Sequence, residues 1–172
     1  MPSLTYLTKK NMQTLKLISL ILLGTLFACQ TPPTATPLAV QYLTSPAKAA
    51  ANPPYSEVVK VGQMLFLSGQ LGYEPGTREL PEGGIQTETH NALQNIETTL
   101  KQHGADLTNV VKVNVYLADI EDYAAMNAVY RGFFTEHFPA RTTLAVAGVP
   151  RGARLEVECV AVVEWQSNGH RN

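Results

Sequence analysis

An arginine and a glutamate that lie fifteen residues apart, Arg141 and Glu156, give the clearest indication of chemistry in this sequence. Apolar and polar residues alternate in the runs 142–147 and 154–163, which predicts two strands joined by a turn at residues 148–152. A hairpin would bring a fixed cation and a carboxylate to the same end of a sheet. That pair suits a small carboxylate substrate that needs proton transfer. A cross-strand ion pair, or two solvated charges, is the alternative that these residues alone leave open.

The rest of the chain supplies the elements that must position this pair. Strands are predicted at 56–61, 64–68 and 111–117. Apolar residues at helical spacing predict one helix from Ile85 to just before Gly104 and a second over 123–134. Asp119 is the expected N-cap of the second helix, with Asp122 completing an acidic variant of the capping box. The order β-β-α-β-α-β-β predicts an α+β domain with a mixed sheet and two helices on one face.

The N-terminal residues resemble an export signal. Three lysines precede a twelve-residue apolar run over 17–28, which is short for a membrane span and typical of a signal peptide. The run ends at Cys29 in a segment similar to a bacterial lipobox, although Phe27 is bulky for its position. We therefore expect a lipoprotein signal peptide (1–28) with either Met1 or Met12 as the true start, and lipidation at Cys29. An ordinary secretory peptide and an uncleaved anchor are the alternatives.

Composition sets the remaining domain limits. Residues 29–51 are rich in Pro, Thr and Ala, which favours an extended tether, followed by a globular domain over 52–166 and a flexible tail over 167–172. Gln30 follows the cysteine where an aspartate would retain a lipoprotein at the inner membrane, so we expect an exported protein, periplasmic or anchored at the outer membrane. A net charge of -1 provides no basic patch for nucleic acid. The four histidines lack metal-ligand spacing, and no phosphate loop is present, so we expect neither metal nor cofactor.

Six short motifs occur in order along the globular part: Pro54-Tyr55, 67–70 (LSGQ), 91–96 (NALQNI), 127–130 (NAVY) with Phe133-Phe134, 138–143 (FPARTT) and 155–158 (LEVE). Together they resemble the RidA (YjgF) family of reactive-intermediate deaminases over about residues 53–163. The resemblance implies a chorismate-mutase-like subunit that assembles as a homotrimer with clefts between subunits. It also implies hydrolysis of enamines and imines such as 2-aminoacrylate to 2-oxo acids and ammonia. Val160 and Val162, on the outward face of the last strand, would suit a subunit interface or a covering layer of helices.

The resemblance also assigns roles to individual residues. Arg141 matches the arginine that binds the substrate carboxylate, and Glu156 the glutamate that handles water and proton. The pocket tyrosine, the turn serine and the helix asparagine of the family match Tyr55, Ser68 and Asn127. Gly69 and Thr143 match further substrate-binding positions, through the backbone amide in the case of Thr143, where many members have cysteine.

Each of these residues also has a structural reading. Tyr55 would pack after its proline pair, Ser68 would be a turn residue, and Asn127 a satisfied amide. The loop before Pro139 is shorter than in some members, and an exported copy leaves the natural imine open. Two other functions stay open: a non-catalytic small-molecule or protein-binding lipoprotein using the same cleft, and an endoribonuclease-like activity.

Overall fold

Six strands form one sheet in the computed structural model, which describes residues 37–163. Along most of them, buried and more exposed side chains alternate. The strand order is β1-β2-β3-β6-β4-β5. In chain order the strands are β1 (Val40–Leu43), β2 (Val58–Val61), β3 (Met64–Leu71), β4 (Val110–Leu117), β5 (Ala140–Ala145) and β6 (Leu155–Val162). Neighbouring strands are antiparallel except β4 and β5, which are parallel. The predicted α+β fold with a mixed sheet is therefore confirmed.

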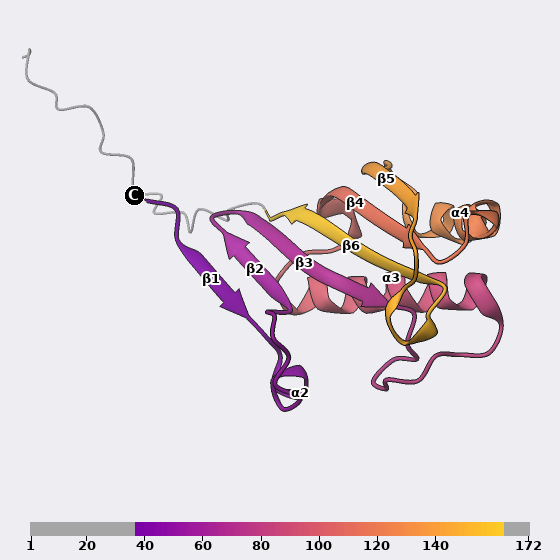
Figure 1. Cartoon of the computed structure of the whole chain (residues 1–172). Helices are drawn as coiled ribbons and strands as arrows, with labels where there is room; N and C mark the ends of the chain where they lie inside the picture. The colour runs from indigo at the N-terminus through magenta and orange to yellow at the C-terminus, as the bar shows by residue number, and fades with distance from the viewer. Residues whose placement is uncertain (1–36, 164–172) are drawn as a thin grey trace, which may run out of the picture. The chain divides into compact units, whose positions relative to one another are not determined.

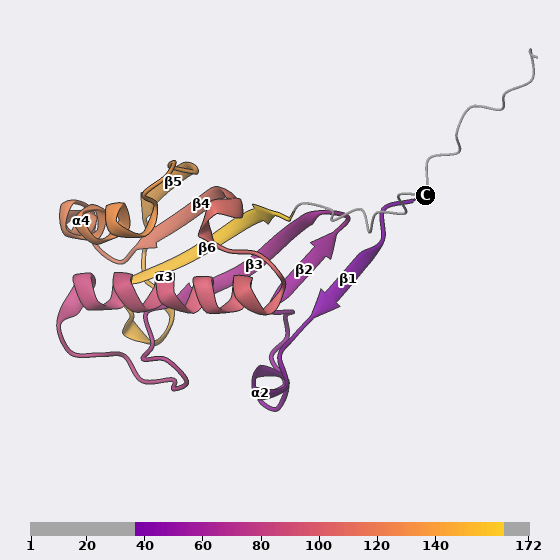
Figure 2. The ribbon, with the colours of Figure 1, turned by 180° about the vertical axis from the view of Figure 1, so that it is seen from behind.

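Two longer helices, α3 (Gly84–Gln102) and α4 (Tyr123–Phe133), cover one face of the sheet (Figures 1 and 2). Leu155, Val157 and Cys159 of the central strand β6 point into the core beneath them and are almost fully buried. Helix α3 ends at Gln102. Gly104, two residues later, has a φ of 74° that suits glycine, and Ala105 N–H donates to Leu100 O at 3.0 Å. Among the described helices, none is both long and apolar enough to span a membrane.

Neither α3 nor α4 lies on the opposite, open face of the sheet (Figures 1 and 2). Met64, Phe66 and Leu144 are each at least 40% exposed, and Val160 and Val162 are half-buried beside Phe66 and Met64. The register pairs Phe66 with Val160 and Met64 with Val162, so these apolar side chains form adjacent cross-strand pairs. The predicted outward position of the two valines is confirmed.

The predicted hairpin between the last two strands is wrong. Strand β5 pairs only with β4, in parallel, and β6 pairs with β3 and β4. A parallel pair needs a crossover connection, and here α4 provides it between β4 and β5. The turn of residues 148–152, which includes a short 3₁₀ helix (Pro150–Gly152), therefore carries the chain across β4 rather than closing a hairpin.

The predicted capping box at the second helix is also wrong in part. Asp119 does accept a hydrogen bond from Glu121 N–H at 3.0 Å, but it caps the 3₁₀ helix Ile120–Asp122 that precedes α4. Asp122 instead accepts two hydrogen bonds from the Arg154 side chain, at 2.9 and 3.0 Å. This bidentate ion pair ties the start of α4 to the start of β6.

The tether predicted over 29–51 is shorter than expected, because β1 lies within it and pairs with β2. A second contact fastens the short helix α2 (Pro46–Ala49). Lys48 Nζ lies 2.8 Å from Glu57 Oε1, and Glu57 Oε2 accepts a bond from Ser45 N–H at 2.9 Å. Burial alone would raise the pKa of Glu57, but the bonds from Lys48 and Ser45 outweigh it and hold that pKa below its ordinary value. The predicted signal peptide, the lipidation site Cys29 and the C-terminal tail lie outside the described residues.

Candidate functional site

Arg141 is held in a fixed position at the edge of the helix-covered face. Its Nη2 donates to Asn127 Oδ1 at 2.6 Å, and its guanidinium carbon lies 4.4 Å from the centre of the Tyr130 ring. A second ring, that of Tyr123, lies 5.9 Å away. A charge-assisted hydrogen bond and a close cation–π contact together restrict the guanidinium. No other residue in 37–163 accepts a hydrogen bond from it, so its other N–H groups can bind an anion.

The parts of this arrangement come from two elements, helix α4 and strand β5. Asn127, Tyr130 and Arg131 are spaced three and four residues apart on α4, so they share a helix face. Arg141 on β5 pairs with buried Val113 of β4, which directs its side chain to the helix face. The Tyr130 side chain is buried and stacks on Phe134, with ring centres 4.6 Å apart. The Tyr130 ring that contacts Arg141 is therefore part of the core.

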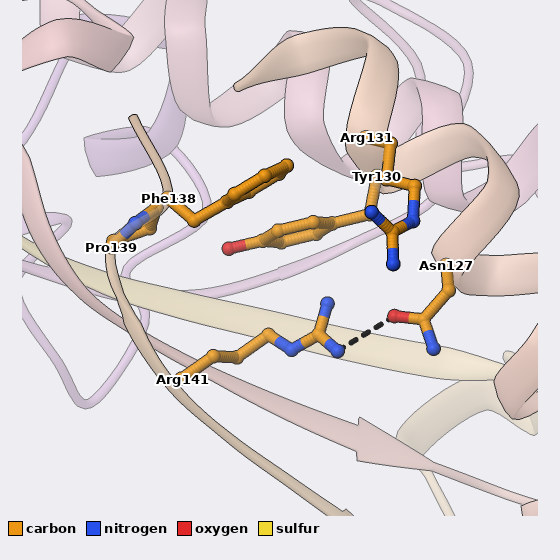
Figure 3. A pocket seen from close by; sticks show the side chains of 6 residues that line it. All are labelled: Asn127, Tyr130, Arg131, Phe138, Pro139 and Arg141. Carbon is orange, nitrogen blue, oxygen red and sulfur yellow. Dashed lines mark hydrogen bonds between the residues drawn. The ribbon is translucent and has the colours of Figure 1, made fainter. Parts of the chain in front are cut away.

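These residues line an open pocket of about 270 Å³ (Figure 3). The lining consists of Asn127, Tyr130, Arg131, Phe138, Pro139 and Arg141. Figure 3 shows the Arg141 guanidinium beneath the Tyr130 ring, with Phe138 and Pro139 closing the side opposite Asn127. Two cations and three ring-bearing side chains make this a site for a small organic anion.

Two hydroxyl groups near Arg141 are buried without a partner among the described residues, those of Tyr130 and Thr143. Burial raises the pKa of Tyr130 to about 12, so the phenol is neutral under ordinary conditions. Thr143 pairs with Val115 and shares the face of Arg141. Both groups are donors that the described residues leave unsatisfied beside the pocket.

Glu156 belongs to a second group, on the open face of the sheet. It lies beside Gly69, where an added Cβ would come within 2.6 Å of its carboxyl carbon. The approach depends on a β-bulge in β3: Leu67 pairs with Cys159 and Gln70 with Val157, so Ser68 and Gly69 together face Glu158. The missing side chain at Gly69 therefore leaves the space that the Glu156 carboxylate occupies.

Ser68 and Tyr55 lie near this second group. The Ser68 hydroxyl donates to Ser56 O at 2.7 Å, and its backbone N–H donates to Glu57 O at 3.0 Å. These bonds connect the bulge to the segment that carries Tyr55, whose side chain is 60% exposed. The structural reading of Tyr55 requires the ring to be packed after its proline pair, and the exposed ring does not fit it.

The electrostatics around Glu156 favour its protonated form. Burial and the neighbouring carboxylate of Glu158 raise the pKa of Glu156 above its ordinary value. Glu158 is itself held by Asn114 Nδ2 at 2.7 Å and by the Tyr116 hydroxyl at 3.0 Å. A carboxyl group with a raised pKa and its own space beside a backbone turn can both take up and return a proton.

Comparison with known proteins identifies the family to which this fold belongs. Residues 45–163 match the model of the family described as Endoribonuclease L-PSP. The chain belongs to this family. The match begins before the predicted domain boundary at residue 52 and includes Ser45, Lys48 and Glu57, so the contact that fastens α2 lies inside the family domain.

Named members of the family are similar over most of the chain. A 2-iminobutanoate/2-iminopropanoate deaminase of Capra hircus is 48% identical over 124 residues, which cover 72% of this chain and 90% of the relative. The human protein of that name is 43% identical over the same length and shares of the two chains. The YjgF gene product of E. coli has a solved structure with a TM-score of 0.65, 33% identity, and coverage of 72% of this chain and 99% of that one. RidA from an Antarctic Psychrobacter matches with a TM-score of 0.63 and 34% identity, over 74% and 99% of the two chains.

The predicted residues of this Endoribonuclease L-PSP family member thus form two groups rather than one. Arg141 and Asn127 line the pocket, and Thr143 lies two residues from Arg141 on the same face of β5. Glu156, Gly69 and Ser68 lie together at the bulge with Tyr55 nearby. Sequence reasoning missed the pocket roles of Tyr130, Arg131, Phe138 and Pro139. The spacing of Tyr130 and Arg131 from Asn127 was the signal that could have found the first two.

Proposed function

We propose that the protein hydrolyses enamines and imines of small 2-amino acids to 2-oxo acids and ammonia. The observation that carries this proposal is the fixed, partly unsatisfied guanidinium of Arg141 in a small pocket, together with a carboxyl group of raised pKa at Glu156. Relatives 43–48% identical that are named 2-iminobutanoate/2-iminopropanoate deaminase support the reaction type. A pure carboxylate binder has no need of the glutamate.

The proposed reaction uses Arg141 to bind the substrate and Glu156 to move a proton. Arg141 binds the substrate carboxylate through a bidentate pair and aligns C2 of the iminium. Deprotonated Glu156 takes a proton from water as the water oxygen attacks C2, which gives a carbinolamine. The same carboxyl group then returns the proton to nitrogen and the C–N bond breaks. The hydroxyl proton passes to the departing ammonia as the C=O bond forms, which gives ammonium and the 2-oxo acid. An enamine enters this sequence after it takes up a proton at its β-carbon.

We further propose that two copies of the chain supply the two groups at one cleft, in a homotrimer. Arg141 lies on the helix-covered face and Glu156 on the open face, so the backbone of the sheet separates them within one copy. The exposed apolar pairs of the open face, such as Phe66 with Val160, are the kind of surface that an interface between copies would bury.

The test is release of 2-oxo acid from imines generated in situ by an amino-acid oxidase, with the full-length protein and its Arg141→Ala and Glu156→Gln variants. We expect hydrolysis well above buffer for the unaltered protein and near the buffer rate for both variants. A folded, assembled protein that matches buffer across several imines would exclude the deaminase and favour the binding lipoprotein. Because the family model is described as an endoribonuclease, an RNA cleavage assay runs in parallel.

We also propose that Cys29 is lipidated and anchors the protein outside the cytoplasm. The support is the sequence alone: a charged start, a twelve-residue apolar run, and a cysteine directly after it. Mass spectrometry of the membrane-extracted protein would show a diacylglyceryl addition at residue 29. A protein of unmodified mass in the soluble fraction would contradict the proposal.

A further inference from the structure

A second guanidinium, that of Arg131, faces the same pocket as Arg141. The two arginines come from different elements, α4 and β5, and both line the pocket. Figure 3 shows the Arg131 side chain reaching down beside Tyr130 toward the space above the Arg141 guanidinium. Binding a single carboxylate requires only one of these groups, so the second one needs another explanation.

The two arginines are held in different ways. Arg141 is half-buried and fixed by Asn127 and Tyr130, as described above. Arg131 is exposed, and its guanidinium carbon lies 5.8 Å from the centre of the Phe138 ring. Within residues 37–163, neither guanidinium lies within 4.0 Å of a carboxylate. The pocket therefore has an inner, rigid cation and an outer cation at its rim.

Two positive charges that share a small pocket repel each other, and bound anions compensate this repulsion. A substrate with one carboxylate compensates only the inner charge. A substrate with a second carboxylate on its side chain compensates both, and the planar guanidinium of Arg131 suits that group as Arg141 suits the first.

The pocket has room for such a side chain. Its 270 Å³ equal about nine water volumes, more than a three-carbon imino acid fills. Phe138 and Pro139 offer an apolar wall for the methylene groups between the two carboxylates.

We infer that Arg131 selects substrates with a second anionic group, the imines and enamines of amino dicarboxylic acids. This inference deepens the proposed deaminase function and rests on it. Arg141 binds the carboxylate next to the reacting carbon, and Arg131 binds the carboxylate at the far end of the side chain. Arg131 is then a specificity residue and takes no part in proton transfer.

The test compares two imines of equal carbon chain length, those of glutamate and norvaline, which differ in carrying a terminal carboxylate or a terminal methyl group. Both are generated in situ by amino-acid oxidases and offered to the full-length protein, and the ratio of their kcat/KM values is measured. Arg131→Gln removes the charge and Arg131→Lys keeps it. Arg78→Gln is the matched control, because Arg78 is exposed in a loop and does not line the pocket.

We expect the unaltered protein to prefer the glutamate imine. An ion pair at the exposed rim of a pocket contributes only a modest binding free energy. Arg131→Gln should therefore reduce this preference by about five- to tenfold, with little change in kcat/KM for the norvaline imine. Arg131→Lys should retain part of the preference, and Arg78→Gln all of it. Calorimetry with the products, 2-oxoglutarate and 2-oxopentanoate, gives the same comparison without turnover.

The outcomes separate this inference from the proposed function. Hydrolysis of the norvaline imine with no Arg131-dependent preference overturns the inference and leaves the deaminase intact. No hydrolysis of either imine, with Arg131-dependent binding of 2-oxoglutarate, removes the deaminase and keeps the dianion site. No hydrolysis and no such binding remove both. Loss of assembly in both Arg131 variants would assign the residue to an interface and also overturn the inference.

Discussion

Arg141 and Glu156 lie on opposite faces of one sheet, with strand β4 between the strands that carry them. Arg141 pairs with Val113, which is buried under the helices, whereas Glu156 pairs with Tyr116, whose side chain lies on the open face with Glu158. Because successive side chains of β4 alternate between faces, Val113 and Tyr116, three residues apart, point in opposite directions. One copy of the chain therefore presents half of the proposed site on each side.

This arrangement predicts that two inactive variants restore activity when they assemble together. Arg141→Ala and Glu156→Gln should each be near background alone. If equal amounts are unfolded together and allowed to reassemble at random, about a quarter of the clefts between copies will combine an intact Arg141 with an intact Glu156. Imine hydrolysis should then recover to about that fraction of the unaltered activity.

Mixing the two variants after each has assembled separately provides the control, since no new clefts form if copies do not exchange. Background activity in the co-refolded sample, with assembly verified by size-exclusion chromatography, would show that both groups act within one copy. The two-copy site would then be wrong.

Alanine substitutions at two glycines, Gly69 in β3 and Gly72 directly after it, should have different effects on activity and stability. In Gly69→Ala the new methyl group meets the end of the flexible Glu156 side chain, which can move away. We expect little change in Tm, and a fall in kcat of about a hundredfold, which is typical when a catalytic group is displaced by about 1 Å.

Gly72→Ala is the matched substitution with the opposite result. Its methyl group would lie 2.5 Å from Glu88 Cα, in the backbone of α3, which cannot give way locally. We expect a loss of about 1–3 kcal/mol in the free energy of unfolding, with near-normal kcat per folded molecule. Thermal unfolding and active-site-normalised kinetics check both variants, and equal effects on Tm would contradict the assignment of Gly69.

Glu158 should set the pH range in which Glu156 works. Burial is the main cause of the raised pKa of Glu156, and the negative charge of Glu158 is the second cause. Since Glu156 must be deprotonated to accept a proton from water, kcat/KM should increase as pH rises through that pKa. Glu158→Gln removes the charge and keeps an oxygen that can accept the bonds from Asn114 and Tyr116, so the acid limb of the profile should move to lower pH.

Glu79→Gln, which removes an exposed loop carboxylate, is the control and should leave the limb in place. The open face also carries a positive charge. Lys112 lies there, bonded to the Thr142 hydroxyl at 2.7 Å, and is unchanged by either substitution. A limb that stays fixed or moves to higher pH in Glu158→Gln would show that Glu158 does not tune Glu156.

The elements with strong periodicity could be predicted from sequence because each buries one face regardless of its neighbours. Helix α3 and strands β4 and β6 belong to this class. In β6 the alternation puts Leu155, Val157 and Cys159 on one face, and the structure buries that face. Alternation within a strand shows which residues share a face, but it does not identify the next strand. For that reason the parallel pairing of β5 with β4 was missed, and with it the separation of Arg141 from Glu156.

Short elements that depend on a partner were not predictable either. Strand β1 has four residues in a segment rich in Pro and Thr, and its side chains are mostly exposed. Its formation depends on the free edge of β2 and on the contact between Lys48 and Glu57, neither of which its own sequence contains. The pocket roles of Arg131 and Phe138 were likewise not predictable, because they depend on how α4 lies beside the start of β5.

The docking of β1 has a consequence for how far the domain can stand from a membrane. Ten residues lie between Cys29 and the first paired residue, Val40, compared with twenty-two for a tether that ends at Ala51. At about 3.5 Å per residue, the longest possible reach falls from about 80 Å to about 40 Å. With a lipid on Cys29, as proposed, the domain would stay close to the bilayer, where it would receive imines released at or just beyond that surface before they diffuse away.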